Sequence, residues 1–385
     1  MLENYLYNHK GFYQAGSKTF INKLEACMEL NRIGGDHHVH WNYHEDVFSR
    51  ALWTHEPPVD IEELYRQRAV QLREQYDHLV LFYSGGADST TILQTFIKNK
   101  IKIDEIIVLG AFKAEEKVIG TLGWDTTPGY YTREVLSITI PTLKELQKTH
   151  KFKITVWDWS EEVINTLEND PDWFWDIGTR FSPDMVPRKT MHDRFRHNDL
   201  ELRGKHVAFI YGIDKPRLYR DDTSVYYAFN DGMLTIGSAA GNADIHKRDW
   251  ENDEFFYWTP NFPLIPIKQA HLIYNYYKKH NILHTLAHLN NKAVFHTPSY
   301  YKIINPIVYP GWDTNTWQIQ KPVSTVRDEF AKWFWDVGPE SAQKRWQEGI
   351  NEVERQLGGR WFNDGSIGSG MIGSFSKFYR IGPIA

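Results

Sequence analysis

The chain has 385 residues, 41% of them hydrophobic and 24% charged, which is typical of a globular protein with one large domain or two to three smaller ones and excludes a mainly disordered chain. A formal net charge of −5 and a pI of about 6.4 remove a general attraction to nucleic acid and favour a small-molecule substrate. The single cysteine, Cys27, excludes an intramolecular disulfide and zinc sites built from cysteines.

Residues 1–70 are expected to form a helical, loop-rich cap on the domain that follows. Apolar residues recur at helical spacing over residues 20–30, and this helix should end before Gly34. A second helix is expected over residues 61–76. The N-terminus lacks the basic and apolar regions of a signal peptide, and no run is long enough to span a membrane, so we expect a cytoplasmic protein without a membrane partner.

Residues 71–240 are expected to form an α/β domain with a parallel, doubly wound sheet. Short apolar runs alternate with helical segments, among them residues 143–150, and predict strands over residues 79–83, 106–109, 153–157 and 206–211. Right-handed crossovers would bring the carboxyl ends of these strands to one edge of the sheet, and ligands bind at that edge in such folds.

The segment from residue 226 onward is expected to close the sheet and then become helical. Asn230-Asp231-Gly232 predicts a hairpin between residues 226–229 and 233–236. Residues 241–385 should form a helix-rich accessory region, with helices over residues 267–280 and 326–335. The Gly- and Ser-rich stretch over residues 358–374 predicts either a flexible tail or a lid that a ligand orders.

The most informative segment is Ser-Gly-Gly-Ala-Asp-Ser-Thr at residues 84–90, which joins the first predicted strand of the sheet to a helix. Gly85 and Gly86 permit a sharp turn and the close approach of a ligand. The first N–H groups of the helix favour an anion, and the two serines add hydroxyl donors. Asp88 would repel a phosphate unless a cation lies between them, so a divalent metal is expected there. The sequence has no G-x-x-x-x-G-K-[ST] motif, and no G-x-G-x-x-G follows a predicted strand.

Residues 84–89 resemble the SGGxDS signature of the PP-loop ATP pyrophosphatase superfamily, which includes asparagine synthetase, NAD synthetase, GMP synthetase and the tRNA lysidine synthetases. The resemblance implies a sheet of the adenine nucleotide alpha hydrolase (HUP-like) type and the binding of ATP with Mg²⁺. It also implies that ATP is cleaved between its α and β phosphates, that a substrate is carried as an adenylate, and that pyrophosphate leaves from the loop. Over its full length the chain resembles phage-encoded PP-loop proteins, but outside residues 78–99 no motif transfers residue roles.

Two observations reduce the number of family members that the chain can resemble in function. With one cysteine the chain lacks the paired cysteines, iron–sulfur cluster or cysteine–zinc site of the sulfur-transferring and 7-cyano-7-deazaguanine-forming members. Residue 2 is leucine, whereas the glutaminase domain of asparagine synthetases uses an N-terminal cysteine. Any nitrogen is therefore expected to come from ammonia in solution, from a partner, or from an amine substrate.

Candidate site residues follow from the motif and from the expected edge of the sheet. The candidate nucleotide-binding residues are Ser84, Gly85, Gly86, Ala87, Asp88, Ser89, Thr90, Leu109, Gly110 and Gly212. Asp88, Asp214, Lys215 and Arg217 are the catalytic candidates, and Asp88 and Asp214 the metal ligands. The two cations would neutralise charge on the departing pyrophosphate. Asparagine-synthetase-like enzymes carry an Asp-Glu pair in the corresponding loop, so a turn with solvated charges stays open as the alternative.

Three other patterns are weighed against simpler interpretations. Arg180, Arg188 and Lys189 lie in a Pro-containing loop that either binds the phosphates of ATP or a substrate carboxylate, or is only solvated. The histidines at residues 37, 38, 40 and 44 have ligand chemistry but no shared face, so an exposed loop is the expectation and a metal site the alternative. The 15 tryptophans are expected to pack in the core rather than stack on a base.

The leading hypothesis is an ATP-dependent, AMP-forming ligase that activates a carboxyl, amide or ring carbonyl for attack by an amine or ammonia, without a glutaminase of its own. One alternative is a PP-loop enzyme that modifies a nucleobase in tRNA or DNA, which the acidic pI does not favour. Another is a non-catalytic nucleotide-binding protein. The sequence leaves open the substrate, the nitrogen source and whether the chain forms a homo-oligomer.

Overall fold

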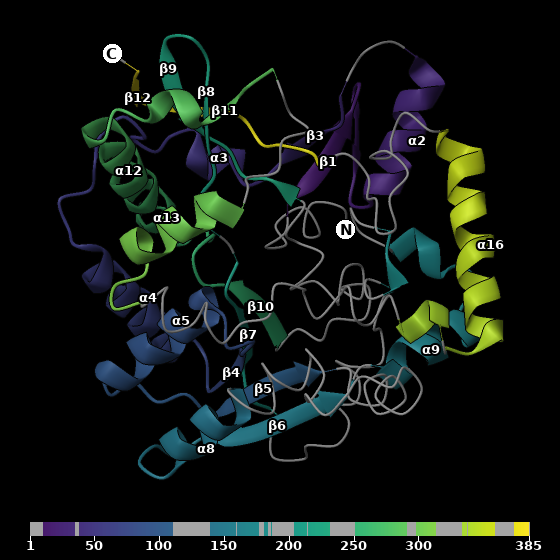
Figure 1. The fold of residues 1–385 in the computed structure, drawn as a ribbon, viewed down its shortest axis with the longest axis horizontal. Coiled ribbons are helices and arrows are strands. Elements are labelled where there is room, and N and C mark those ends of the chain that lie inside the picture. Colours follow the sequence, from purple (N-terminus) through teal and green to yellow (C-terminus); the bar gives the residue numbers. More distant parts are fainter. Residues whose placement is uncertain are drawn as a thin grey trace.

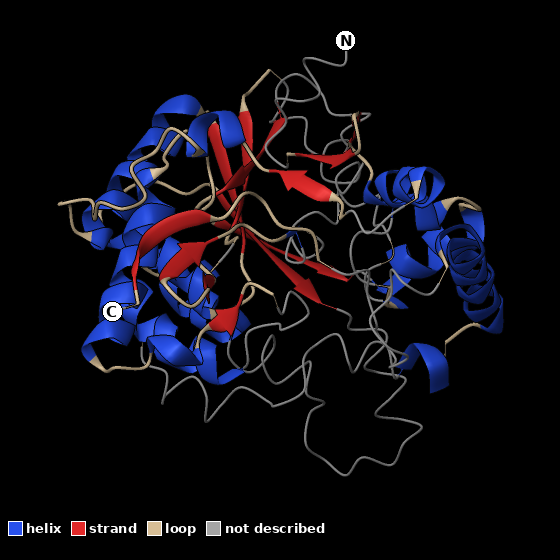
Figure 2. Ribbon diagram, turned by 90° about the horizontal axis from the view of Figure 1, so that it is seen from above, coloured by secondary structure: helices blue, strands red, loops and turns tan. Residues whose placement is uncertain are grey.

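The structure is a computed structural model of the chain. It describes residues 11–34, 38–110, 139–158, 160–176, 181–183, 186, 204–213, 215–231, 251–290, 298–312, 333–336, 338–358 and 373–384. Figure 1 shows helices α4, α5, α12 and α13 grouped on one side of the molecule and helices α2, α9 and α16 on the other. Most of the strands lie between these two groups (Figure 2).

The central sheet has five parallel strands in the order β10-β7-β4-β5-β6. Its strands are β4 (His78–Phe82), β5 (Glu105–Gly110), β6 (Lys153–Asp158), β7 (Val207–Tyr211) and β10 (Glu251–Phe255). The first strand in the sequence lies in the middle, and the strand order reverses between β4 and β7. This order is compatible with a Rossmann-like, doubly wound fold, in which such a reversal creates a crevice at the carboxyl ends of the two strands.

Four of these strands confirm the predicted apolar runs, but β10 was not predicted. Its sequence, Glu-Asn-Asp-Glu-Phe, has one apolar residue in five and no pattern typical of a buried strand. Glu254 is nevertheless 1% exposed, because Arg68 Nη2 donates to its Oε2 at 2.6 Å and the Tyr76 hydroxyl donates to its Oε1. The parallel sheet therefore extends beyond residue 240, where we expected the central domain to end.

Helices pack around this sheet as the sequence predicted. Helices α4 (Ile61–Gln75) and α5 (Ala87–Lys98) pack against each other and against β4, and α12 (Leu264–Lys279) packs on α4 and on α13 (Pro298–Val308). The helix predicted from residue 143 is α8 (Ile140–Gln147), which leads into β6, and α9 (Ser160–Asn169) follows that strand. The tryptophans among the largest fully buried side chains are Trp41, Trp173 and Trp258, which confirms packing as their role.

The N-terminal region is less helical than expected. Three short antiparallel strands form a separate sheet, in the order β2-β1-β3, before and after α2 (Lys23–Ile33). The strands are β1 (Phe12–Ala15), β2 (Lys18–Phe20) and β3 (His40–Asn42), and the short helix α3 (Glu45–Phe48) follows them. Strands of three or four residues carry too little alternation to be recognised. Helix α2 begins after residue 20 because Asn22 Oδ1 caps it, accepting from Leu24 N at 2.7 Å.

A further sheet, of four strands, has the order β11-β8-β9-β12. It contains β8 (Leu218–Arg220), β9 (Ser224–Tyr227), β11 (Ala287–His288) and β12 (Tyr379–Pro383), with the 3₁₀ turn η7 (Leu283–Thr285) before β11. The prediction of a strand at Tyr226 is confirmed: β9 pairs with β8, to which a short turn connects it, and with β12, both antiparallel. The expected partner strand over residues 233–236 lies outside the described residues.

The last helix, α16 (Glu340–Leu357), packs against α2, α9 and the 3₁₀ turn η2 (Trp173–Asp176). Gly349 allows this contact, because a Cβ at this position would lie 2.6 Å from the ring of Trp173. Of the helix predicted over residues 326–335, the described part is residues 333–335, which are helical. Most of the predicted tail, residues 359–372, lies outside the described residues. None of the helices in the described ranges combines the length and apolar composition that a membrane crossing requires.

His271 on α12 is expected to make the stability of the fold depend on pH. Its Nε2 lies 2.8 Å from the carbonyl oxygen of Trp53, and burial lowers its pKa below the ordinary value of 6.5. The unfolded chain therefore binds a proton more readily, so the free energy of unfolding should fall as the pH drops through 6.5. Urea titrations at a series of pH values should show a weaker acid dependence for His271→Gln, and identical profiles would contradict this prediction.

Candidate functional site

The turn after β4 is tight, and it leads directly into helix α5. Gly85 has a φ of 76°, in the left-handed region, and a Cβ at this position would lie 2.5 Å from Thr139 Oγ1. Gly86 is the N-cap of α5, and in the described part of the chain no side chain caps this helix. The first N–H groups of α5 are therefore left to bind an anion.

Ser84 and Ser89 hold this turn together. The Ser84 N–H donates to Ser89 Oγ at 3.2 Å, the Gly86 N–H donates to Ser84 Oγ at 3.2 Å, and the two hydroxyl oxygens lie 3.2 Å apart. The Thr90 hydroxyl is buried instead against Tyr83, with 3.3 Å between the two oxygens. The serines thus organise the loop in advance. The Thr90 N–H donates to the Gly86 carbonyl oxygen at 3.0 Å, so the role of Thr90 in nucleotide binding stays a prediction.

The end of β7 approaches the same turn, as predicted for Gly212. A Cβ on Gly212 would lie 2.9 Å from Asp88 Cβ and 3.2 Å from the backbone nitrogen of Ser89. Only glycine therefore lets the chain after β7 pass this close to the beginning of α5. Because β4 and β7 are the strands between which the strand order reverses, the turn lies at the place where doubly wound sheets bind ligands.

Asp88 lies between a cation and a phenol. Lys215 Nζ forms an ion pair with its Oδ2, and the Tyr309 hydroxyl donates to its Oδ1. The Tyr257 hydroxyl donates to the backbone oxygen of Asp88 at 2.8 Å. Burial, and next the charge of Asp88, raises the pKa of Tyr309 well above its ordinary value, so this phenol stays a neutral donor. The cation that Asp88 requires is thus supplied in this structure by Lys215.

Helix α13 fixes the loop that carries Lys215. The Tyr300 hydroxyl donates to the Pro216 carbonyl oxygen at 3.0 Å and accepts from the Leu218 N–H at 3.3 Å. Lys215 Nζ lies 5.5 Å from the centre of the Tyr301 ring, within the range of a cation–π contact. The helix-rich region after residue 240 therefore contributes directly to the site around Asp88.

The structure describes three of the remaining predicted site residues, Leu109, Gly110 and Arg217. Leu109 and Gly110 end β5, beside β4, at the carboxyl edge of the sheet. Arg217 is 3% exposed, and its Nη1 donates to Asn230 Oδ1 at 3.4 Å. Asp214 lies outside the described residues, as does most of the loop over residues 179–190, so their roles stay predictions. Within the same loop, Phe181 and Ser182 are buried.

Sequence reasoning missed three residues near the turn: Thr139, Tyr257 and Tyr309. Tyr309 lies 221 positions from Asp88, and no local pattern connects them. Thr139 follows a segment to which the resemblance gave no role. A weak signal existed for Thr139, because threonine directly before a Pro-containing helix start is typical of an N-cap.

The described residues do not build a metal centre from protein side chains alone. Across the described ranges, no three His, Cys, Asp or Glu side chains come together as a metal-binding group. His40 Nε2 lies 2.8 Å from Glu45 Oε1, and His37 is outside the described residues. Mg²⁺ commonly uses one or two protein carboxylates together with phosphate oxygens, and Asp88 fits that mode as a single carboxylate.

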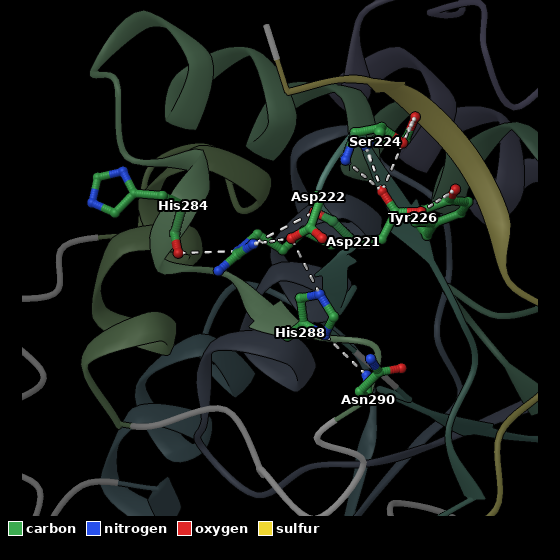
Figure 3. A network of polar contacts seen from close by, with 9 residues as sticks. Asp221, Asp222, Ser224, Tyr226, His284, His288 and Asn290 are labelled. Atoms are coloured by element: carbon green, nitrogen blue, oxygen red, sulfur yellow. Dashed lines mark hydrogen bonds and ion pairs between the residues drawn. The ribbon is translucent and has the colours of Figure 1, made fainter.

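A second polar network lies in the β8–β9 turn (Figure 3). Asp221 accepts hydrogen bonds from the Thr223 and Ser224 N–H groups, both at 2.7 Å, and from the Tyr226 hydroxyl at 2.8 Å. These donors lower the pKa of Asp221, beginning with Thr223. His288 Nε2 lies 3.7 Å from Asp222 Oδ1, and Asp222 is 93% exposed. The network shapes a surface turn and contains no cradle for a ligand.

In comparisons with known proteins, no family model matches the sequence and no curated protein matches it. The turn of residues 84–89, its place in the sheet and the contacts of Asp88 therefore carry the functional argument.

Proposed function

We propose that the chain binds ATP over the turn of residues 84–89 and cleaves it to AMP and pyrophosphate. A carboxyl, amide or ring carbonyl of a small molecule would attack the α-phosphorus, and an amine or ammonia would then displace AMP from the adenylate. The observation that carries the proposal is the meeting of this turn with Gly212 between β4 and β7. The strand order β10-β7-β4-β5-β6 supports the adenine nucleotide alpha hydrolase (HUP-like) type of sheet as part of the same proposal.

The described residues divide the work between anion binding and charge balance. The uncapped N–H groups of α5 bind phosphate oxygens, and Ser84 and Ser89 keep the loop in a binding shape. Lys215 neutralises Asp88 before a nucleotide arrives, so that the carboxylate does not repel the phosphates. When the bond between the α-phosphorus and the bridging oxygen breaks, Lys215 stands close enough to the loop to offset charge on the leaving pyrophosphate.

Magnesium belongs to the proposal as a companion of the phosphates. When bound, Mg²⁺ supplies positive charge to the phosphate oxygens and orients them. Asp88 is the described residue that would hold it, with Asp214 as the predicted second ligand. Tyr309 keeps Asp88 Oδ1 oriented, and Lys215 must release Oδ2 for the ion to reach that oxygen.

The direct test is the identity of the products formed from ATP. The protein is incubated with Mg²⁺, ATP labelled in its α and γ phosphates, ammonium and a panel of carboxylic acids and amides, and the products are separated by chromatography. We expect AMP and pyrophosphate, and we expect Asp88→Ala to lower their formation by at least about 100-fold. Asp222→Ala, which changes a carboxylate that is 93% exposed, is the matched control and should keep full activity.

Two outcomes would contradict this function. ADP and phosphate as products would place the cleavage at the wrong bond. Tight binding of ATP without turnover across the whole panel would favour a non-catalytic nucleotide-binding protein, in which the Asp88–Lys215 ion pair stays closed.

A further inference from the structure

Thr139 is the N-cap residue of α8, but its side chain does not cap that helix. A threonine in this position normally accepts a hydrogen bond from one of the next backbone N–H groups. Thr139 has φ −62° and ψ −55°, makes no such bond, and turns its hydroxyl toward Gly85 instead. The Oγ1 atom lies 2.5 Å from the point where a Cβ of Gly85 would stand.

This hydroxyl group is buried without a partner. Thr139 is 0% exposed, and within the described part of the chain its Oγ1 has no hydrogen-bond partner. An unpaired buried hydroxyl costs free energy, and such groups are few in native proteins. Its position against the phosphate-binding loop gives a physical reason for keeping it, because a bound anion would accept its hydrogen bond.

Two helices also begin at this point. Helix α5, with 12 residues, starts one residue after Gly86, and α8, with 8 residues, starts directly after Thr139. Helix α5 has no side-chain cap, so its first N–H groups and its positive dipole end are available to an anion beside Gly85. Thr139 itself has helical backbone angles, so the beginning of α8 contributes its hydroxyl rather than a free helix N-terminus.

We infer that Thr139 is a phosphate-binding residue of this site and that its hydroxyl donates to an oxygen of the pyrophosphate portion of the nucleotide. The cradle then has two walls, the turn of residues 84–89 and the beginning of α8, and it binds pyrophosphate in preference to a single phosphate. Gly85 is glycine because any side chain would separate the two walls. This inference rests on the proposed nucleotide site and adds a residue from a segment that the motif does not include.

The test compares Thr139→Val, which removes the hydroxyl at constant shape, with Thr139→Ser, which keeps it. Inorganic pyrophosphate and inorganic phosphate are titrated into each full-length protein by calorimetry, and the melting temperature is measured without ligand. We expect Thr139→Val to bind pyrophosphate roughly 10- to 100-fold more weakly and Thr139→Ser to retain most of the affinity. Without ligand, Thr139→Val should melt no lower than the unmodified protein, because it loses an unpaired buried hydroxyl.

The outcomes separate this inference from the proposed function. Equal pyrophosphate affinity of the unmodified protein and Thr139→Val would overturn the role of Thr139 and leave the nucleotide site standing. A lower melting temperature of Thr139→Val without ligand, restored in Thr139→Ser, would show a structural role and would also overturn it. If the unmodified protein binds neither pyrophosphate nor ATP, the proposed function fails together with this inference.

Discussion

Replacing Gly85 with alanine is expected to weaken the binding of ATP and pyrophosphate on the order of 100-fold, because the loop must move away from α8. Two effects add at this position. An L-residue at a φ of 76° is strained by about 1–2 kcal/mol, and the new Cβ would lie 2.5 Å from Thr139 Oγ1. The turn can relieve this overlap only by displacing the N–H groups that bind phosphate. Calorimetric titration of pyrophosphate into Gly85→Ala measures the loss.

The matched control for this prediction is Gly358→Ala at the end of α16. Gly358 also has a positive φ, of 69°, so an alanine there is strained too, but no atom lies within 4 Å of the added Cβ. This variant should therefore lose some stability and keep full affinity. If Gly85→Ala bound pyrophosphate as tightly as Gly358→Ala does, the turn of residues 84–89 would not be the phosphate-binding loop.

The parts of the fold that the sequence predicted are those whose signals are local. The strands β4, β5, β6 and β7 are apolar runs in a polar context, and β4 meets the glycine pair of the turn directly. Strand β10 was not predicted because it is acidic. The burial of its Glu254 depends on Arg68, which lies 186 positions earlier in the chain. The meeting of the strand ends, by contrast, could be predicted from one rule: the carboxyl ends of parallel strands lie at the same edge of a sheet. Gly212 lies beside the turn of residues 84–89, as this rule requires.

In the candidate site, too, some features were predictable from the sequence and others depend on contacts between distant residues. Charge considerations predicted a cation beside Asp88 and named a divalent metal, which stays a prediction, and the strand-end rule brought the loop of Lys215 to the same edge of the sheet. The structure pairs Asp88 with Lys215 and adds Tyr309, from residues that lie 127 and 221 positions away. Contacts at such separation depend on tertiary packing, here that of α13 against α12 and against the loop after β7. Packing of this kind leaves no periodic pattern in the sequence.

Replacing Lys23 with methionine is expected to lower the free energy of unfolding by about 3–5 kcal/mol. Lys23 Nζ lies 2.7 Å from Asp231 Oδ2, and the side chains of the two residues are 4% and 0% exposed. The Tyr13 hydroxyl donates to the same carboxylate at 3.1 Å, and the Ser374 N–H donates to Oδ1 at 2.7 Å. Without the lysine, the fold must hold an uncompensated carboxylate in its interior. Urea unfolding followed by circular dichroism measures the change.

Lys18→Met is the control for the loss of a lysine near the N-terminus. Lys18 pairs with Glu29 at 3.0 Å, but its side chain is 57% exposed, so its removal should cost no more than about 1 kcal/mol. The double variant Lys23→Met with Asp231→Asn should recover part of the lost stability, because it removes the buried charge as well. An equal cost for the two lysines would contradict the prediction.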